Sequence, residues 1–177
     1  RADLQRPGGA DMSEGRYYGK FRGSVRNNID PLMKGRLMVE VPDVGGNLLS
    51  SWAMPCLPVA GMNMGMFTVP PIGAGVWVEF ERGDPDYPVW VGGYYATAVL
   101  ARMVPPGVSG ITLQTMAKNG IVISDVPGPG GGILIQTSTG AMISVSDTGI
   151  IISNGKGAAI NMTGPTVDIN LGALTVV

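Results

Sequence analysis

Four carboxylates fall close together between residues 79 and 86, and grouped carboxylates are what metal binding and acid–base catalysis often use. Glu79 and Glu81 are two residues apart, which puts both on the same face of the strand that the sequence predicts there. Asp84 and Asp86 belong to the segment Gly-Asp-Pro-Asp, whose composition is typical of a turn. A solvated strand face and a turn account for all four residues, so we predict neither a catalytic nor a metal site in this cluster.

Three further acidic residues, Asp125, Asp147 and Asp168, recur in the second half of the chain. They can be interpreted either as turn residues or as calcium ligands. We interpret them as turn residues, because the Gly-Gly-x-Gly-x-Asp pattern of calcium-binding repeats is absent. Residues 128–132 resemble a phosphate-binding loop only in glycine content, since no Gly-Lys-Ser/Thr follows. The chain contains no histidine, which removes the Ser-His-Asp triad, the Cys-His pair and histidine metal ligands. We therefore predict a protein that is not an enzyme and holds no cofactor.

The composition indicates an all-β protein with many turns. Of its 177 residues, 45% are hydrophobic and only 14% are charged, and 28 glycines and 14 prolines supply turn positions. The net charge of −1 argues against a nucleic-acid binder that works by neutralising phosphates. No apolar run approaches the roughly 20 residues that cross a bilayer, and the polar start of the chain lacks the apolar core of a signal peptide.

The chain divides into two parts of different composition. We predict an N-terminal segment 1–15, a first domain 16–98, a linker 99–110 and a second domain 111–177. Every Trp, Tyr and Phe lies in the first part. Short stretches there alternate apolar and polar residues or are bounded by turn signals, as strands should be; they are residues 19–26, 36–41, 52–59, 76–81 and 88–95. The prolines of the third stretch would place it at a sheet edge or interrupt it. Five short strands in so small a domain fit a closed or partly closed barrel such as an OB-fold.

The second part is a repeat. After a first interval of 12 residues, glycines recur every 7 to 9 residues from position 132 to position 172, and a short β-rich segment lies in each interval. Short strands at a fixed period, separated by small turn residues, are typical of a β-solenoid.

The length of the repeat favours an assembly of three chains. A single-chain solenoid needs about three such strands per coil, so residues 111–177 would make fewer than three coils with open edges. Three chains that each supply one side of a triangular prism would instead share one core, with about seven strands per chain stacked over roughly 34 Å. We expect strand hydrogen bonds to continue from chain to chain. The predicted trimer core consists of Ile121, Ile123, Ile133, Ile135, Ile143, Val145, Ile151, Ile160, Met162, Val167 and Ile169.

Short motifs in residues 16–95 occur in a characteristic order. They are Tyr18-Gly19-Lys20, Gly23-Ser24-Val25, Asp30-Pro31, Lys34-Gly35-Arg36-Leu37, Trp52-Ala53, Pro70-Pro71-Ile72-Gly73, Val76-Trp77-Val78-Glu79-Phe80 and Gly83-Asp84. In this order and spacing they resemble the OB-fold domain that phage baseplate spike proteins share with the VgrG proteins of type VI secretion. The repeat that follows is similar, in placement and period, to the triple-stranded β-helix of the same family.

The resemblance implies a structural spike, in which an OB-fold barrel is followed by an intertwined trimeric β-helix needle. The homotrimer would sit in a baseplate below a hub and tube and puncture the target envelope when the sheath contracts, touching the target membrane only transiently. About 15 residues precede the barrel, so we expect the hub to be a separate protein. A PAAR-type tip protein is expected at the other end. The particle would be assembled in the bacterial cytoplasm and act at the target cell surface. A phage, an R-type bacteriocin, an extracellular injection system and a type VI secretion system remain open as the machine.

Two interfaces follow from the resemblance. The predicted contact with the hub or with neighbouring barrels consists of Tyr17, Tyr18, Lys20, Arg22 and Arg26. The predicted contact with the tip protein consists of Leu171, Leu174, Val176 and Val177. The alternating methionines at 62, 64 and 66 are either core filler or a flexible contact with a partner.

Two other functions remain open at this point. Lys20, Arg22 and Arg26, interleaved with Tyr17, Tyr18 and Phe21, could form a platform for single-stranded nucleic acid, and binding that falls with salt would identify it. A β-helical polysaccharide depolymerase would release reducing sugars, although the sequence offers no plausible carboxylate pair for it.

Overall fold

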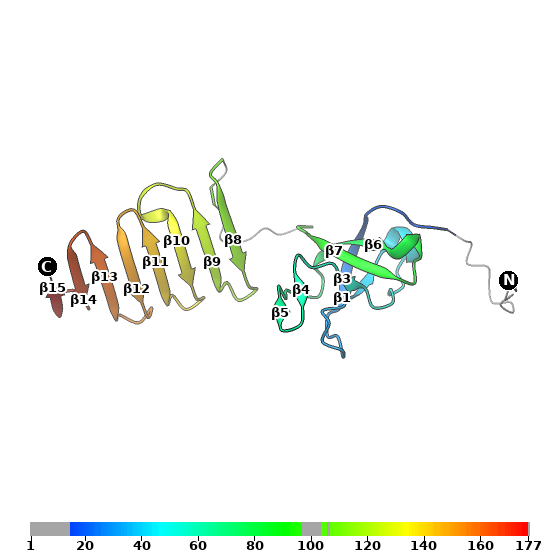
Figure 1. Ribbon diagram of the computed structural model, residues 1–177, viewed down its shortest axis with the longest axis horizontal. Coiled ribbons are helices and arrows are strands. Elements are labelled where there is room, and N and C mark those ends of the chain that lie inside the picture. The colour runs from blue at the N-terminus through cyan, green and yellow to red at the C-terminus, as the bar shows by residue number, and fades with distance from the viewer. Residues whose placement is uncertain (1–14, 97–103, 106, 177) are drawn as a thin grey trace, which may run out of the picture. The chain divides into compact units, whose positions relative to one another are not determined.

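The computed structural model describes residues 15–96, 104, 105 and 107–176, and Figure 1 shows the elements that they form. The chain separates into two compact units, Arg1–Ala98 and Val99–Val177. Helical structure among the described residues is limited to one turn of α-helix, α1 (Pro42–Gly45), and two 3-10 turns, η1 (Glu81–Gly83) and η2 (Gly128–Gly130). The prediction of an all-β chain is confirmed.

The first unit is built on a half-barrel sheet of five strands with the order β2-β1-β6-β7-β3. These strands are β1 (Phe21–Asn27), β2 (Met38–Glu40), β3 (Met54–Pro55), β6 (Gly75–Phe80) and β7 (Pro88–Tyr94). A separate two-stranded hairpin joins β4 (Ala60–Gly61) to β5 (Met64–Gly65).

Alternation along the strands builds the core of the first unit. Val25 on β1 and Val76 and Val78 on β6 are fully buried, while the residues that flank Val25 and Val78 along their strands are more exposed. Trp90 on β7 is 5% exposed and donates its indole N–H to the carbonyl oxygen of Gly35 at 3.1 Å. The same period of two that predicted the strands therefore also selects the core.

The segment predicted as a strand over 52–59 is much shorter in the structure. Only β3 remains, at the edge of the sheet, where Met54 and Pro55 pair in parallel with Val89 and Trp90. Proline has no backbone N–H to give to a ladder, which explains the short edge strand. The β4–β5 hairpin and α1 were not predicted, because elements of two to four residues leave no periodic pattern in the sequence.

The register defines two ends of the first unit. Gly75, which begins β6, pairs with Ser24 on β1 and with Tyr94 at the end of β7. The last residues of β1, the start of β6 and the point where the chain leaves β7 therefore lie at one end, which we call the exit end. Phe80 and Pro88, which are paired with each other, lie at the opposite end, which we call the distal end.

The second unit is a single antiparallel sheet of eight strands, each paired with its neighbours in the sequence. The strands are β8 (Gly110–Gln114), β9 (Gly120–Ser124), β10 (Gly132–Gln136), β11 (Met142–Ser146), β12 (Gly149–Ser153), β13 (Ala159–Thr163), β14 (Thr166–Ile169) and β15 (Leu174–Val176). Figure 1 shows them as a ladder in chain order. The sheet has one strand more than the seven expected. The expectation of hydrogen bonds from chain to chain is wrong for these pairings, which all lie within the chain.

Three turns on one side of this ladder share a five-residue design. The first residue, Thr115, Thr137 or Asn154, accepts a hydrogen bond through its side-chain oxygen from the backbone N–H four residues later. The fourth residue of each turn, Lys118, Gly140 or Gly157, has a positive φ. These hydroxyl and amide side chains take over backbone donors that the ladder does not use, which explains why small polar residues follow the strands.

Gly149→Ala is expected to destabilise the second unit more than Gly157→Ala. Both glycines have a positive φ, but a Cβ at Gly149 would run into the carbonyl oxygen of Met162, whereas a Cβ at Gly157 meets no atom within 4 Å. We expect a loss of about 2 kcal/mol or more for Gly149→Ala, and about 1 kcal/mol for Gly157→Ala. Denaturant unfolding followed by circular dichroism measures both, and equal losses would contradict the assigned clash.

Candidate assembly surfaces

The strand register of the second unit gathers apolar side chains on one face of its sheet. Cross-strand partners point to the same face, and side chains alternate along each strand. Each of the eight strands contributes two apolar residues to one face, which we call the apolar face. Its members are Ile111, Leu113, Ile121, Ile123, Ile133, Ile135, Ile143, Val145, Ile150, Ile152, Ile160, Met162, Val167, Ile169, Leu174 and Val176.

The opposite face of the same sheet is mainly small and polar. Thr112, Ser144 and Asn161 are typical members, each set between two residues of the apolar face. Apolar residues are a minority there; Val122 on β9 and Leu134 on β10 pair with each other, and Ile151 lies on β12. The sheet therefore has one face suited to water and one suited to a core.

Nothing within the chain covers the apolar face among the described residues. Ile123, Ile135 and Ile152 remain 42%, 45% and 41% exposed. Every side chain of the buried hydrophobic core belongs to the first unit, from Val25 to Trp90. An uncovered apolar surface of this extent marks an interface, because soluble proteins rarely leave one open to water.

Ten of the eleven residues predicted as the trimer core lie on the apolar face. The exception is Ile151, which pairs with Ser144 and Asn161 on the opposite face, so its placement with the others is a correction. Its neighbours Ile150 and Ile152 take the apolar face instead. A run of three isoleucines has no alternation of its own, so only the pairing with β11 and β13 settles which of them share a face.

The sequence does carry a signal that would have found Ile150 and Ile152. Each of β8, β9, β10 and β12 begins with a glycine, and the apolar face takes the first and third residues after it. In β12 the glycine is Gly149, so the rule selects Ile150 and Ile152. The same rule gives Ile111 and Leu113 on β8, which were also missed.

The basic residues predicted to contact the hub already have partners within the first unit. Lys20 pairs with Glu79, and the Arg26 Nε lies 2.8 Å from the Glu40 Oε2. The Arg22 guanidinium carbon lies 5.7 Å from the ring centroids of both Trp77 and Tyr94. These contacts reduce the charge available for nucleic acid. The basic residues are also separated in space, because Lys20 is near the distal end and Arg26 is near the exit end.

The two tyrosines of the same set lie near the distal end in different environments. Tyr17 packs edge-on against Phe21 at 6.0 Å between ring centroids and beside Phe80, so it extends the core. Tyr18 is 68% exposed and available for contact. The hub contact of all five residues stays a prediction.

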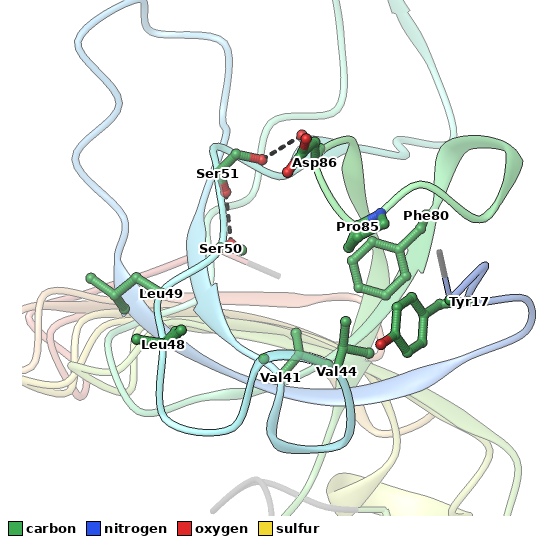
Figure 2. Close-up of a pocket in the computed structure, with 12 residues that line it drawn as sticks. Tyr17, Val41, Val44, Leu48, Leu49, Ser50, Ser51, Phe80, Pro85 and Asp86 are labelled. Atoms are coloured by element: carbon green, nitrogen blue, oxygen red, sulfur yellow. Dashed lines mark hydrogen bonds between the residues drawn. The ribbon is translucent and has the colours of Figure 1, made fainter. Parts of the chain in front are cut away.

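An open pocket of about 300 Å³ lies at the distal end of the first unit. Figure 2 shows Leu48 and Leu49 on one side of it, Tyr17 and Phe80 on the other, and Val44 at its base. The serine and aspartate at its upper rim are joined by a hydrogen bond from the Ser51 hydroxyl to the Asp86 carbonyl oxygen at 2.7 Å. Leu48 and Leu49 are 71% and 53% exposed, so the pocket offers apolar surface to a partner.

The residues predicted to hold a tip protein divide between a turn and the last strand. Leu171 is 85% exposed in the turn before β15. Leu174 and Val176 belong to β15, an edge strand of the sheet, and continue the apolar face. Val177 lies outside the described residues. Their contact with a tip protein stays a prediction.

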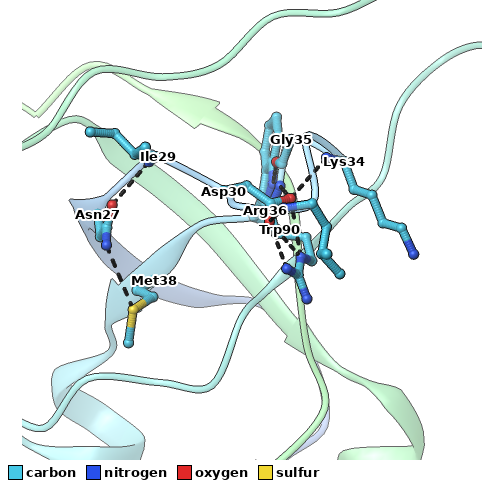
Figure 3. Close-up of polar contacts among 9 residues, drawn as sticks. Asn27, Ile29, Asp30, Lys34, Gly35, Arg36, Met38 and Trp90 are labelled. Carbon is cyan, nitrogen blue, oxygen red and sulfur yellow. Dashed lines mark hydrogen bonds and ion pairs between the residues drawn. The ribbon is translucent and has the colours of Figure 1, made fainter.

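A clasp centred on Asp30 fixes the loop between β1 and β2. The Asp30 carboxylate, 3% exposed, accepts hydrogen bonds from the Arg36 guanidinium at 2.6 Å and from the backbone N–H groups of Leu32, Lys34 and Arg36 (Figure 3). The Arg36 guanidinium and these amides hold the pKa of Asp30 well below its ordinary value. Arg36 also lies over the Trp52 ring at 5.2 Å. The clasp therefore gives the loop one conformation.

Metal sites and membrane-spanning helices have no candidate among the described residues. No group of three or more His, Cys, Asp or Glu residues in residues 15–96, 104, 105 and 107–176 is arranged to hold a metal ion. Within the same part of the chain, no helix has the length and apolar character needed to span a bilayer.

Comparison with protein families gives two matches that do not overlap and together span most of the chain. Residues 21–95 match the type VI secretion system/phage-baseplate injector OB domain. Residues 110–175 match the phage baseplate V C-terminal trimerisation domain. A search of curated proteins finds no match. The first match coincides with the half-barrel of the first unit, and the second with the sheet that carries the apolar face.

Proposed function

Because this chain belongs to the baseplate spike and VgrG-like family of phage tails and type VI secretion systems, we propose that it is the central spike of a contractile injection machine. As a member of this family it is a structural baseplate protein, and its C-terminal domain is a trimerisation domain. In the proposal, three chains form a needle that is driven through the target envelope when the sheath contracts.

The observation that carries the proposal is the uncovered apolar face. Three copies of the sheet, each with this face turned inward, would form a triangular prism in which the faces cover one another. Burial of an isoleucine side chain contributes about 1.5–3 kcal/mol, and two side chains from each of eight strands in three chains would be buried together. The prism supplies the hydrophobic core that the second unit of a single chain lacks.

The mechanical role follows from how the sheet is bonded. Every strand pairs with its neighbours along the chain, so bending the sheet must distort several rows of backbone hydrogen bonds together. Three such sheets joined by a common core would resist bending in every direction. A stiff needle concentrates the force of sheath contraction on a small area of membrane, and no chemical step is required.

The two ends of the protein have different partners in this proposal. A hub protein would contact the distal end of the first unit, where Tyr18 and the rims of the pocket at Leu48 and Leu49 are exposed. A PAAR-type tip protein would cover β15, an edge strand whose outer side has no neighbouring strand within the described residues. It would also cover the apolar side chains of that strand. The particle would be assembled in the bacterial cytoplasm.

The proposal is tested with particles from cells that produce the machine. We expect cryo-electron microscopy to place a three-fold needle of this chain at the end of the tube. Particles from a deletion strain should lose the ability to permeabilise target cells, measured by dye entry, and the wild-type gene should restore it. Particles that lack this chain and permeabilise target cells as well as the wild type would overturn the puncturing role.

A further inference from the structure

A second apolar surface lies on the first unit and plays no part in the proposed needle. Eight large apolar residues of the loop 28–36 and the segment 60–73 are mainly exposed. We call them the exit-end patch: Ile29, Leu32, Met33, Met62, Met64, Met66, Phe67 and Ile72. Met33 and Met62 expose 85% and 92% of their surface. So many exposed apolar side chains on one small unit indicate a contact surface.

The two segments that carry the patch are joined to each other. The Asn28 side-chain amide donates to the Pro70 carbonyl oxygen at 3.0 Å. The Phe67 ring lies against Gly35, where an added Cβ would be 3.2 Å from it. The Gly73 N–H donates to the Val25 carbonyl oxygen at 2.8 Å. These contacts bring residues about 40 positions apart in the sequence onto one surface.

The loop half of the patch is rigid before any partner binds. The Asp30 clasp fixes the loop through its own hydrogen bonds, and the Trp90 indole N–H donates to the carbonyl oxygen of Gly35. Met33 has a φ of 51°, an uncommon conformation for a residue other than glycine, and its side chain points away from the core. A loop that is held in one conformation while it displays apolar side chains loses little entropy on binding.

The patch lies at the exit end, from which the chain continues to the trimerisation domain. The loop 28–36 follows the end of β1, and β3 runs parallel to β7, so the chain after Pro55 heads toward the same end. The stretch between Tyr95 and Gly110 spans at most about 50 Å when fully extended. Trimerisation therefore holds the exit ends of three copies near one another, at high effective concentration.

The charge pattern favours a second copy of this chain as the partner. No charged residue occurs between Asp43 and Glu79, a stretch that includes the whole segment 60–73. In the loop half, Asp30 and Arg36 pair with each other, which leaves Lys34 as the one charged side chain outside the clasp. Lys34 is thus the one charge that three identical patches would repeat near a common axis, so repulsion between like charges stays small.

We propose that the exit-end patch packs against the OB units of the neighbouring copies in the trimer, so that the barrels form a fixed collar instead of three independent domains. The proposal rests on the homotrimer of the proposed function. It gives the methionines a role, since their flexible side chains can fit the uneven surface between adjacent barrels.

Methionine oxidation in the purified full-length protein tests this contact. The wild-type protein is treated with hydrogen peroxide together with N-acetylmethionine amide as an internal reference, and each methionine is followed by mass spectrometry. We expect Met33 and Met62 to oxidise at least about tenfold more slowly than the reference, although both are almost fully exposed in a single chain. Oxidation of both at the reference rate in a protein with the mass of a trimer would overturn the proposal.

Met62→Lys is the matched variant. It places three charges in the proposed collar but does not touch the apolar face of the second unit. The variant should keep the mass of a trimer, while Met33 becomes open to peroxide. Protection of Met33 that persists in this variant, or that arises only in assembled particles, would overturn the contact between copies. A single-chain mass of the wild-type protein would instead refute the trimer of the proposed function, so the two failures are distinguishable.

Discussion

Ile152→Asp is expected to abolish the trimer, whereas Ile151→Asp should leave it intact. Ile152 lies on the apolar face and pairs with Ile143 and Ile160, so the substitution would place three carboxylates in the shared core. An uncompensated buried charge costs on the order of several kcal/mol, and the three carboxylates would also repel one another. Ile151 is the adjacent residue with the same chemistry and 37% exposure, and its side chain lies on the opposite face of the sheet.

Light scattering or native mass spectrometry of the two variants measures this effect. The wild type and Ile151→Asp should give three times the chain mass of 18.4 kDa, and Ile152→Asp should give the mass of one chain or aggregate. Near-ultraviolet circular dichroism reports on the tryptophans, which all lie in the first unit, and shows whether that unit remains folded. A stable trimer of Ile152→Asp would contradict the inward orientation of the apolar face.

Asp30→Ala is expected to lower the melting temperature of the first unit by roughly 5–10 °C. The substitution leaves the Arg36 guanidinium and three backbone N–H groups without their shared acceptor. The matched control is Glu79→Gln, which removes the exposed ion pair with Lys20, a type of contact that contributes little. Differential scanning calorimetry distinguishes the two, and equal effects would show that the clasp does not hold the loop.

The clasp also predicts how stability depends on pH. The folded protein lowers the pKa of Asp30, so the stabilisation is fully present above the ordinary pKa of an aspartate, about 3.9. It is lost progressively as the pH falls below that value toward the lower folded pKa, because the unfolded chain takes up the proton first. The difference in melting temperature between the wild type and Asp30→Asn should therefore shrink between about pH 4 and pH 2. A difference that stays constant over this range would contradict the assignment.

Much of the fold and part of the candidate interface could be predicted from local patterns. Alternation along residues 76–81 identified β6 and its buried side, because a strand puts every second side chain on the same face. The glycine period located the strands of the second unit, and ten members of the apolar face followed from it. The order of short motifs in the first part indicated the family. Each of these features can be read from the order and spacing of residue types along the chain.

The remaining features depend on which strands lie next to each other. Ile150, Ile151 and Ile152 are chemically identical, and only the register with β11 and β13 separates Ile151 from the other two. The exit-end patch likewise joins Met33 to Phe67 through contacts between loops that are distant in the sequence.

The sequence by itself determined that this is an all-β protein with an OB-like barrel, a glycine-punctuated repeat and a family resemblance to baseplate spikes. Only the tertiary structure decided which face of the repeat is apolar throughout, that its ladder bonds lie within one chain, and that the loop 28–36 of the barrel meets the segment 60–73. The physical reason is that alternation and turn chemistry are local properties of a strand, whereas register and the meeting of loops are set by pairing between distant segments.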